Sequence, residues 1–93
     1  MIVSFADRNT EMLWVKRTSK ALPHDVHERA LSKLNILDSA VVLEDLGQPP
    51  GNHLKALSGN RNGQFSIRIN QKWRICFYWT DAGPADVEIV DYH

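Results

Sequence analysis

The sequence has little of what builds disulfide-linked, metal-binding or membrane-spanning proteins. Its one cysteine, Cys76, cannot form an internal disulfide, and no cysteines and histidines have the spacing of a metal site. No stretch approaches the ~18 apolar residues that span a bilayer. The opening, MIVSFADRNTEMLW, has no basic segment followed by an apolar one. We therefore expect a cytoplasmic protein with no metal, cofactor or membrane partner, and we interpret Cys76 as a structural thiol.

Net charge is also lacking, but the charges are unevenly distributed along the chain. The 93 residues carry 11 basic and 11 acidic side chains and fit one domain over residues 1–93. Residues 46–80 contain no aspartate or glutamate. A local anion site is therefore compatible with a neutral protein. The basic residues of that acid-free stretch are Lys55, Arg61, Arg68, Lys72 and Arg74.

Two helices are predicted in the first half of the chain. After a β-prone start, MIVSF, a short helix is expected through residues 7–15, with Asp7 or Asn9 as its cap. The clearer helix is PHDVHERALSKLNILD, residues 23–38, which has proline in its first turn and one apolar face. That face, which must be core, carries Val26, Ala30, Leu34 and Leu37.

The other side chains of the second helix are interpreted as surface residues. His24 and His27 lie in its first turn, with nothing spaced to bind a metal with them. Its outer face, with Glu28, Lys33 and Asn35, remains free for a partner because the apolar face packs inside.

The segment from Asp38 to Gly63 loses periodicity and gathers turn residues in GQPPGN and SGNRNG. It is predicted to be a long connection with at most one short helical turn. Connections of this length in compact domains tend to be functional.

Three consecutive strands follow, because the apolar period changes to two. Helices followed by consecutive strands predict an α+β fold, with an N-terminal strand and two helices packed on a small antiparallel sheet. The bulky core candidates in the strands all have odd numbers, which places them on one buried face. They are Phe65, Ile67, Ile69, Trp73, Ile75, Phe77, Trp79, Ala85, Val87 and Ile89.

This parity selects the register of the first hairpin. A three-residue loop over 70–72 keeps Trp73 inside, whereas a two-residue loop would bury Arg74. Arg68 and Arg74 then lie directly opposite each other on the non-core face, at a cost of up to ~1 kcal/mol in repulsion. Two interpretations stay open: a solvated pair with splayed side chains, or a seat for an anion.

The third strand brings the C-terminus to the same face. Pairing Trp79 with Ala85 continues to Arg74 opposite Val90, and this places Tyr92 diagonal to Arg74, with His93 next. Asp91 has core-face parity, but at a strand end it would turn outward or bond the helical layer.

Guanidiniums, a phenol and an imidazole together suit a phosphodiester. Arginine binds phosphate bidentately, histidine exchanges protons near neutral pH, and tyrosine stacks on bases. Without a metal cluster, the chemistry expected is attack by an RNA 2′-hydroxyl on its own phosphate. The alternative is a basic surface beside a frayed tail.

A family resemblance rests on these residues. LKALSGNRNGQFSIRINQKWRICFYW followed by VEIVDYH, with MIVSF at the start, resembles the HigB-type toxins, or killer proteins, of the RelE/ParE superfamily. The most specific pieces are the G-[ND]-R-x-G turn at residues 59–63, the W-R-I pattern at 73–75 and the terminal D-Y-H. The resemblance implies a bacterial type II toxin that cleaves mRNA on the translating ribosome. It also implies a HigA-like helix-turn-helix antitoxin, through which alone the toxin contacts operator DNA.

The resemblance assigns roles residue by residue. The loop pattern L-H-x-L-K-G of many relatives reads Leu54-Lys55-Ala56-Leu57-Ser58-Gly59 here, so Lys55 replaces a histidine and Ser58 a lysine. His53 would substitute only if the loop shifts, and a mild toxin is expected. The catalytic residues implied are Arg68, Arg74, Asp91, Tyr92 and His93, and the RNA-binding ones are His53, Lys55, Arg61 and Lys72.

Two other functions stay open. Because the superfamily includes toxins that poison DNA gyrase, the chain could act by binding gyrase or the ribosome without cleavage. The third possibility is a detoxified protein that serves only as a co-repressor with its antitoxin.

Overall fold

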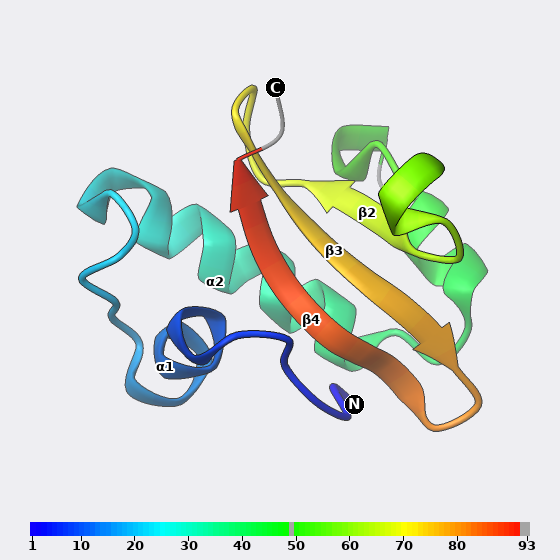
Figure 1. The fold of residues 1–93 in the computed structure, drawn as a ribbon, viewed down its shortest axis with the longest axis horizontal. Coiled ribbons are helices and arrows are strands. Elements are labelled where there is room, and N and C mark those ends of the chain that lie inside the picture. Colours follow the sequence, from blue (N-terminus) through cyan, green and yellow to red (C-terminus); the bar gives the residue numbers. More distant parts are fainter. Residues whose placement is uncertain (49, 92–93) are drawn as a thin grey trace.

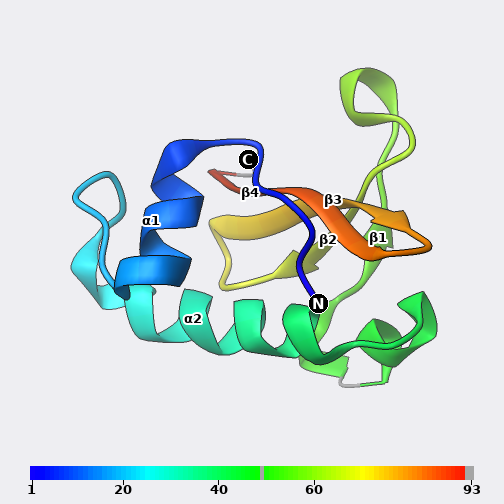
Figure 2. The same cartoon turned by 90° about the horizontal axis from the view of Figure 1, so that it is seen from below.

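The computed structural model describes residues 1–48 and 50–91, which form two helices and a four-stranded antiparallel sheet (Figure 1). Helix α2 runs along one face of the sheet, and α1 lies beside β4 and contacts both α2 and β4 (Figure 2). This confirms the α+β arrangement with its last three strands consecutive. No helix in the described ranges has the length and apolar character to cross a membrane. The elements are α1 (Arg8–Lys16), α2 (His24–Ser39), η1 (Leu43–Gly47), η2 (Pro50–Asn52), β1 (Lys55–Ala56), η3 (Gly59–Arg61), β2 (Phe65–Arg68), β3 (Trp73–Thr80) and β4 (Gly83–Asp91).

The core lies between α2 and the sheet face that carries the odd-numbered residues. Phe77, Ile75 and Val87 are fully buried there, against Leu34 and Leu37 of α2. Apolar alternation in the strands and the apolar face of α2 therefore predicted most of the core, because each element has one face that must leave water. The prediction is wrong for Ala85, which is half-buried and pairs with the exposed Tyr78, while Pro84 is buried in its place.

The hairpin between β2 and β3 has the predicted three-residue loop. The Ile69 N–H donates to the Trp73 carbonyl at 2.9 Å. The Asn70 Oδ1 accepts the N–H groups of Lys72 and Trp73, both at 2.8 Å. This side chain acts as a turn acceptor and closes the loop.

The hairpin between β3 and β4 is right at one end and wrong at the other. Arg74 lies opposite Val90, as predicted, but Trp79 pairs with Pro84 rather than with Ala85. A register shift between Cys76 and Tyr78 absorbs the extra residue. Parity alone does not predict such a β-bulge. The bulge places two residues of β4 opposite one of β3, so the pairing differs from the predicted one on the turn side and agrees with it on the other side.

The predicted N-terminal strand is reduced to a single parallel bridge between Phe5 and Val87. The segment does follow β4, since the Val3 N–H donates to the Pro84 carbonyl at 2.7 Å and Ala6 donates to Val87 at 2.9 Å. Proline has no N–H to return, and the left-handed backbone of Asp86 (φ 50°) interrupts the β4 edge. A regular ladder is therefore not formed.

The connection from residue 40 to residue 63 is more structured than predicted. Instead of at most one helical turn, it contains three 3-10 turns and strand β1, which pairs Lys55 with Ser66. The buried side chains of Leu46, Asn52 and Leu57 fix it to the rest of the molecule. These anchors are isolated in the sequence, so no period reveals them.

The first turn of α2 corrects another interpretation. His27, predicted to be a surface residue, is buried, and its Nε2 lies 3.1 Å from the Leu22 carbonyl oxygen. His24 is exposed, as predicted. In α1, Asp7 occupies the N-cap position but makes no side-chain capping bond. Spacing predicted the helices correctly but not the partners of their polar side chains.

Truncation of Phe77 tests the core. Phe77→Ala should lower the free energy of unfolding by ~3–5 kcal/mol, because a fully buried ring leaves a cavity. Val15→Ala, at a 66% exposed position in α1, should change it by less than about 0.5 kcal/mol. Urea titration followed by circular dichroism measures both. Equal losses would contradict this placement of the core.

Candidate functional site

Two arginines face each other on the sheet surface opposite the helices. Arg68 of β2 lies directly across from Arg74 of β3, as the three-residue loop requires. Both side chains are half-buried. The two guanidiniums turn apart and bind different acceptor atoms, which relieves their repulsion. The loop residue His53 supplies one acceptor to each: its ring nitrogen to Arg68 and its carbonyl to Arg74.

The Arg74 guanidinium is held over β2. Its Nε donates to the Ser66 hydroxyl oxygen at 2.7 Å, and its Nη2 donates to the carbonyls of His53 at 2.5 Å and Ser66 at 3.3 Å. Ser66 is fully buried. Three bonds in a fixed fork orient this side chain, as phosphate recognition by arginine requires.

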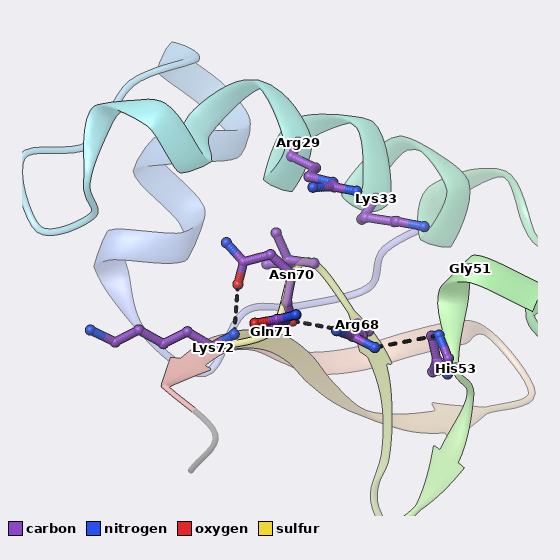
Figure 3. Close-up of a pocket in the computed structure, with 9 residues that line it drawn as sticks. Arg29, Lys33, Gly51, His53, Arg68, Asn70, Gln71 and Lys72 are labelled. Carbon is purple, nitrogen blue, oxygen red and sulfur yellow. Dashed lines mark hydrogen bonds between the residues drawn. The ribbon is translucent and has the colours of Figure 1, made fainter.

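The Arg68 guanidinium turns the other way, toward the β2–β3 loop. Its Nε donates to the Asn70 carbonyl at 3.1 Å, and its Nη1 lies 3.5 Å from the Nε2 of His53 (Figure 3). An arginine N–H donates only to an unprotonated ring nitrogen, so this contact requires the His53 tautomer with its proton on Nδ1.

His53 reaches the arginines because the residue before it is anchored. Asn52 is fully buried, its Nδ2 donates to the Leu46 carbonyl at 3.0 Å, and its Oδ1 accepts the Lys33 ammonium at 2.7 Å. His53 itself is exposed and has a left-handed backbone, with φ 45°. Such strained conformations persist where the surroundings impose them, and they cluster at functional sites.

Arg61 has a different environment. Its Nη1 donates to Glu88 of β4 and to Gln64, both at 3.1 Å, and the guanidinium and carboxylate are about one-third exposed. Burial opposes the charge of Arg61, but the bond to Glu88 and the negative charge nearby raise its pKa overall. The predicted RNA-binding residue is thus tied to a carboxylate and fixes η3 on the sheet.

Cys76 lies at the centre of the same sheet face, fully buried although its parity is that of the non-core face. Burial raises the pKa of its thiol, and Glu88 raises it further, against the opposing effect of Arg61 and Arg74. A thiol that keeps its proton is a poor nucleophile. Cys76 is therefore a packing residue, as the sequence indicated.

The remaining predicted residues lie around the arginine pair. Lys55 is exposed in β1, and the Lys72 ammonium lies 3.6 Å from the Asp91 carboxylate. Asp91 therefore turns outward toward the β2–β3 loop rather than to the helical layer. Tyr92 and His93, predicted as catalytic, lie outside the described residues. No group of three or more potential metal ligands occurs within residues 1–48 and 50–91.

A pocket of about 670 Å³ opens beside Arg68, between α2 and the β2–β3 loop (Figure 3). Two helix residues, Arg29 and Lys33, contribute basic side chains that sequence reasoning did not assign to the site. Burial and the neighbouring Arg29 lower the pKa of Lys33. The available signal was their spacing of four, which places them on one helix face. The remaining lining residues are Gly51, His53, Ile69, Asn70, Gln71 and Lys72.

The sequence matches a known family over nearly its whole length. A family model described as the RelE-like toxin of the type II toxin-antitoxin system HigB covers residues 3–93. The chain belongs to this family of HigB-like toxins. It is 35% identical to Toxin HigB-1 of Vibrio cholerae over 94 residues, 100% of this chain and 98% of that protein. It is 28% identical to Endoribonuclease HigB of Proteus vulgaris over 93 residues, 100% of both chains.

A toxin of a type II system has an antitoxin partner, so the partner class of this HigB-like toxin follows from its family. The site of this HigB-like toxin brings together Arg68, Arg74 and His53 from two strands and a loop. It also places Lys72 against Asp91 at the sheet end.

The accessibility of Cys76 to alkylation tests its assignment. Because burial raises the pKa of the thiol, little thiolate exists at neutral pH, and iodoacetamide should react at least about tenfold more slowly with the native protein than with the urea-unfolded protein. Mass spectrometry follows the reaction. Fast alkylation of the native protein at neutral pH would contradict a buried, protonated thiol.

Proposed function

We propose that this HigB-like toxin is an endoribonuclease that cleaves mRNA on translating ribosomes in the cytoplasm. A helix-turn-helix antitoxin neutralises it and carries it to operator DNA. The supporting observation is that Arg68 and Arg74, from adjacent strands, both contact His53. The relative from Proteus vulgaris is named an endoribonuclease.

The reaction suited to these side chains is attack by the ribose 2′-hydroxyl on the adjacent phosphorus. A base takes the 2′-hydroxyl proton, an acid protonates the departing 5′-oxygen, and the products are a 2′,3′-cyclic phosphate and a new 5′-hydroxyl. Negative charge builds on the non-bridging oxygens in the transition state. Arg74, already oriented by Ser66, and Arg68 would neutralise it.

His53 and His93 are the proposed acid and base. His53 takes the place of the loop histidine that the family pattern puts at Lys55, because the anchored Asn52 and the left-handed turn direct it to the arginines. His93 is the second imidazole, Tyr92 stacks on a base, and Asp91 positions His93. Lys55, Arg61 and Lys72 flank the RNA, Arg61 through the loop that it holds.

The contact between Arg68 and His53 affects how the site would work. For His53 to accept a proton through Nε2, Arg68 must first leave that nitrogen. A hydrogen bond of 3.5 Å is long and weak, so a phosphate that attracts Arg68 would break it at small cost. Substrate binding would thus free the His53 ring nitrogen to act as a base. A base that is contacted by Arg68 in the free protein agrees with a mild toxin.

Substitution of Arg74 tests the phosphate-binding role. Arg74→Ala should reduce cleavage by about 10²–10³-fold, because an oriented charge at the phosphate is removed. Arg74→Lys should recover only part of it, since an ammonium cannot reproduce the fork of bonds. The measurement is mapping of RNA 5′ ends after induction in cells. Lys20→Ala, at an exposed position beyond α1, is the matched control.

Several outcomes would contradict cleavage. Intact mRNA in growth-arrested cells would favour a toxin that only binds its target, and arrest of replication would identify gyrase. Normal growth after induction without the antitoxin would favour the co-repressor.

Substitution of the two imidazoles separates their roles. His53→Ala and His93→Ala should each lower cleavage by about 10²-fold or more if both exchange protons. His53→Gln should retain thermal stability but not activity, because an amide keeps hydrogen bonding and loses acid-base chemistry. Full activity of His53→Gln would show that His93 acts without a loop histidine.

A further inference from the structure

The pocket beside Arg68 is lined by cations from two separate elements. Arg29 and Lys33 project from α2 on one side, and Arg68 lies on the other side with His53 (Figure 3). None of the lining residues within the described ranges is acidic. The pocket therefore collects positive charge in a protein whose formal net charge is zero.

Within residues 1–48 and 50–91, Arg29, Lys33 and Arg68 form no ion pair with a carboxylate, although Asp25 and Glu28 lie near Arg29 on the outer side of α2. Lys33 donates to the amide oxygen of Asn52, and Arg68 donates to a carbonyl and an imidazole, all neutral acceptors. The lowered pKa of Lys33 is the expected effect of burial beside another cation, Arg29. Lys72 differs: it lines the wall, but its ammonium pairs with Asp91.

We infer that this pocket binds a backbone phosphate of RNA next to the phosphate held at Arg74. The inference rests on the proposed function, because Arg68 belongs to both places: it lies opposite Arg74 in the sheet and lines the pocket. An RNA strand bound across the sheet face at Arg74 and Arg68 would continue past Arg68 toward Arg29 and Lys33. The volume of about 670 Å³ is within the range of small-ligand sites and accommodates a nucleotide.

RNA fits better than an acidic peptide because of this continuity. A peptide carboxylate would bind the same cations in the pocket. Only a continuous RNA strand, however, would also place a neighbouring phosphate at Arg74, with Arg68 between the two phosphates. Arg29 is the cleanest residue to change, since it has no hydrogen-bond partner among the described residues. Lys33 also supports the buried Asn52, so its removal affects folding as well as charge.

The experiment measures binding rather than cleavage. Fluorescence anisotropy is recorded for fully 2′-O-methylated RNA, which cannot undergo 2′-hydroxyl attack, as a trimer and as a nonamer. For the nonamer, Arg29→Gln and Arg29→Gln/Lys33→Gln should each lower affinity about tenfold. The slope of log affinity against log salt should also become shallower, by about 0.7 for each phosphate that is no longer neutralised. Trimer affinity should stay unchanged. Lys16→Gln/Lys20→Gln, with the same charge change at exposed positions, is the control.

A second arm identifies the source of the phosphate. If the pocket binds a phosphate of the mRNA that is cleaved, wild type and Arg29→Gln should cosediment equally with ribosomes that carry no mRNA. A decrease there, with nonamer affinity unchanged, would support an RNA phosphate supplied by the ribosome. Unchanged binding to both would overturn the inference, and so would weaker antitoxin binding alone, which would indicate an acidic peptide. Absence of cleavage with pocket-dependent binding would overturn the proposed function instead.

Discussion

The register of the β2–β3 hairpin is the constraint on which the rest of the site depends. The Asn70 side chain closes a three-residue loop by accepting two N–H groups, and this places Arg68 opposite Arg74. A loop shorter by one residue would exchange the faces of β3 and bring Arg74 into the core. The buried face and the arginine face are therefore fixed by the same few hydrogen bonds, so core packing also maintains the spacing of the two guanidiniums.

The connection between α2 and β2 carries the second constraint. Asn52 links Lys33 of α2 to the Leu46 carbonyl, and the chain then turns left-handed at His53. The His53 carbonyl accepts Arg74 while its ring contacts Arg68. Through this linkage α2 takes part in positioning the loop, although it packs on the opposite face of the sheet. A buried amide satisfied on both sides is rigid, because releasing it would leave polar atoms without partners.

Periodic features were predictable from the sequence and isolated ones were not. The odd-numbered core residues and the pairing of Arg68 with Arg74 follow from alternation and loop length, which are local rules. The bulge in β4, the burial of His27 and the 3-10 turns after residue 40 have no periodic signal, because they depend on individual contacts such as the one between His27 and the Leu22 carbonyl. His53 is the clearest case: the family pattern points to Lys55, and only the anchored loop brings His53 to the arginines.

The partners of each arginine distinguish support from function. Arg61 is neutralised by Glu88, a carboxylate of β4, so its charge is used within the fold. Arg68 is held by a carbonyl and an imidazole, which fix its direction and leave its charge unbalanced. Two like charges on adjacent strands cost stability, and a fold gains nothing from them by itself. An anion-binding surface requires neutral acceptors that hold such a cation in place without cancelling its charge, because the charge then remains available to an anion.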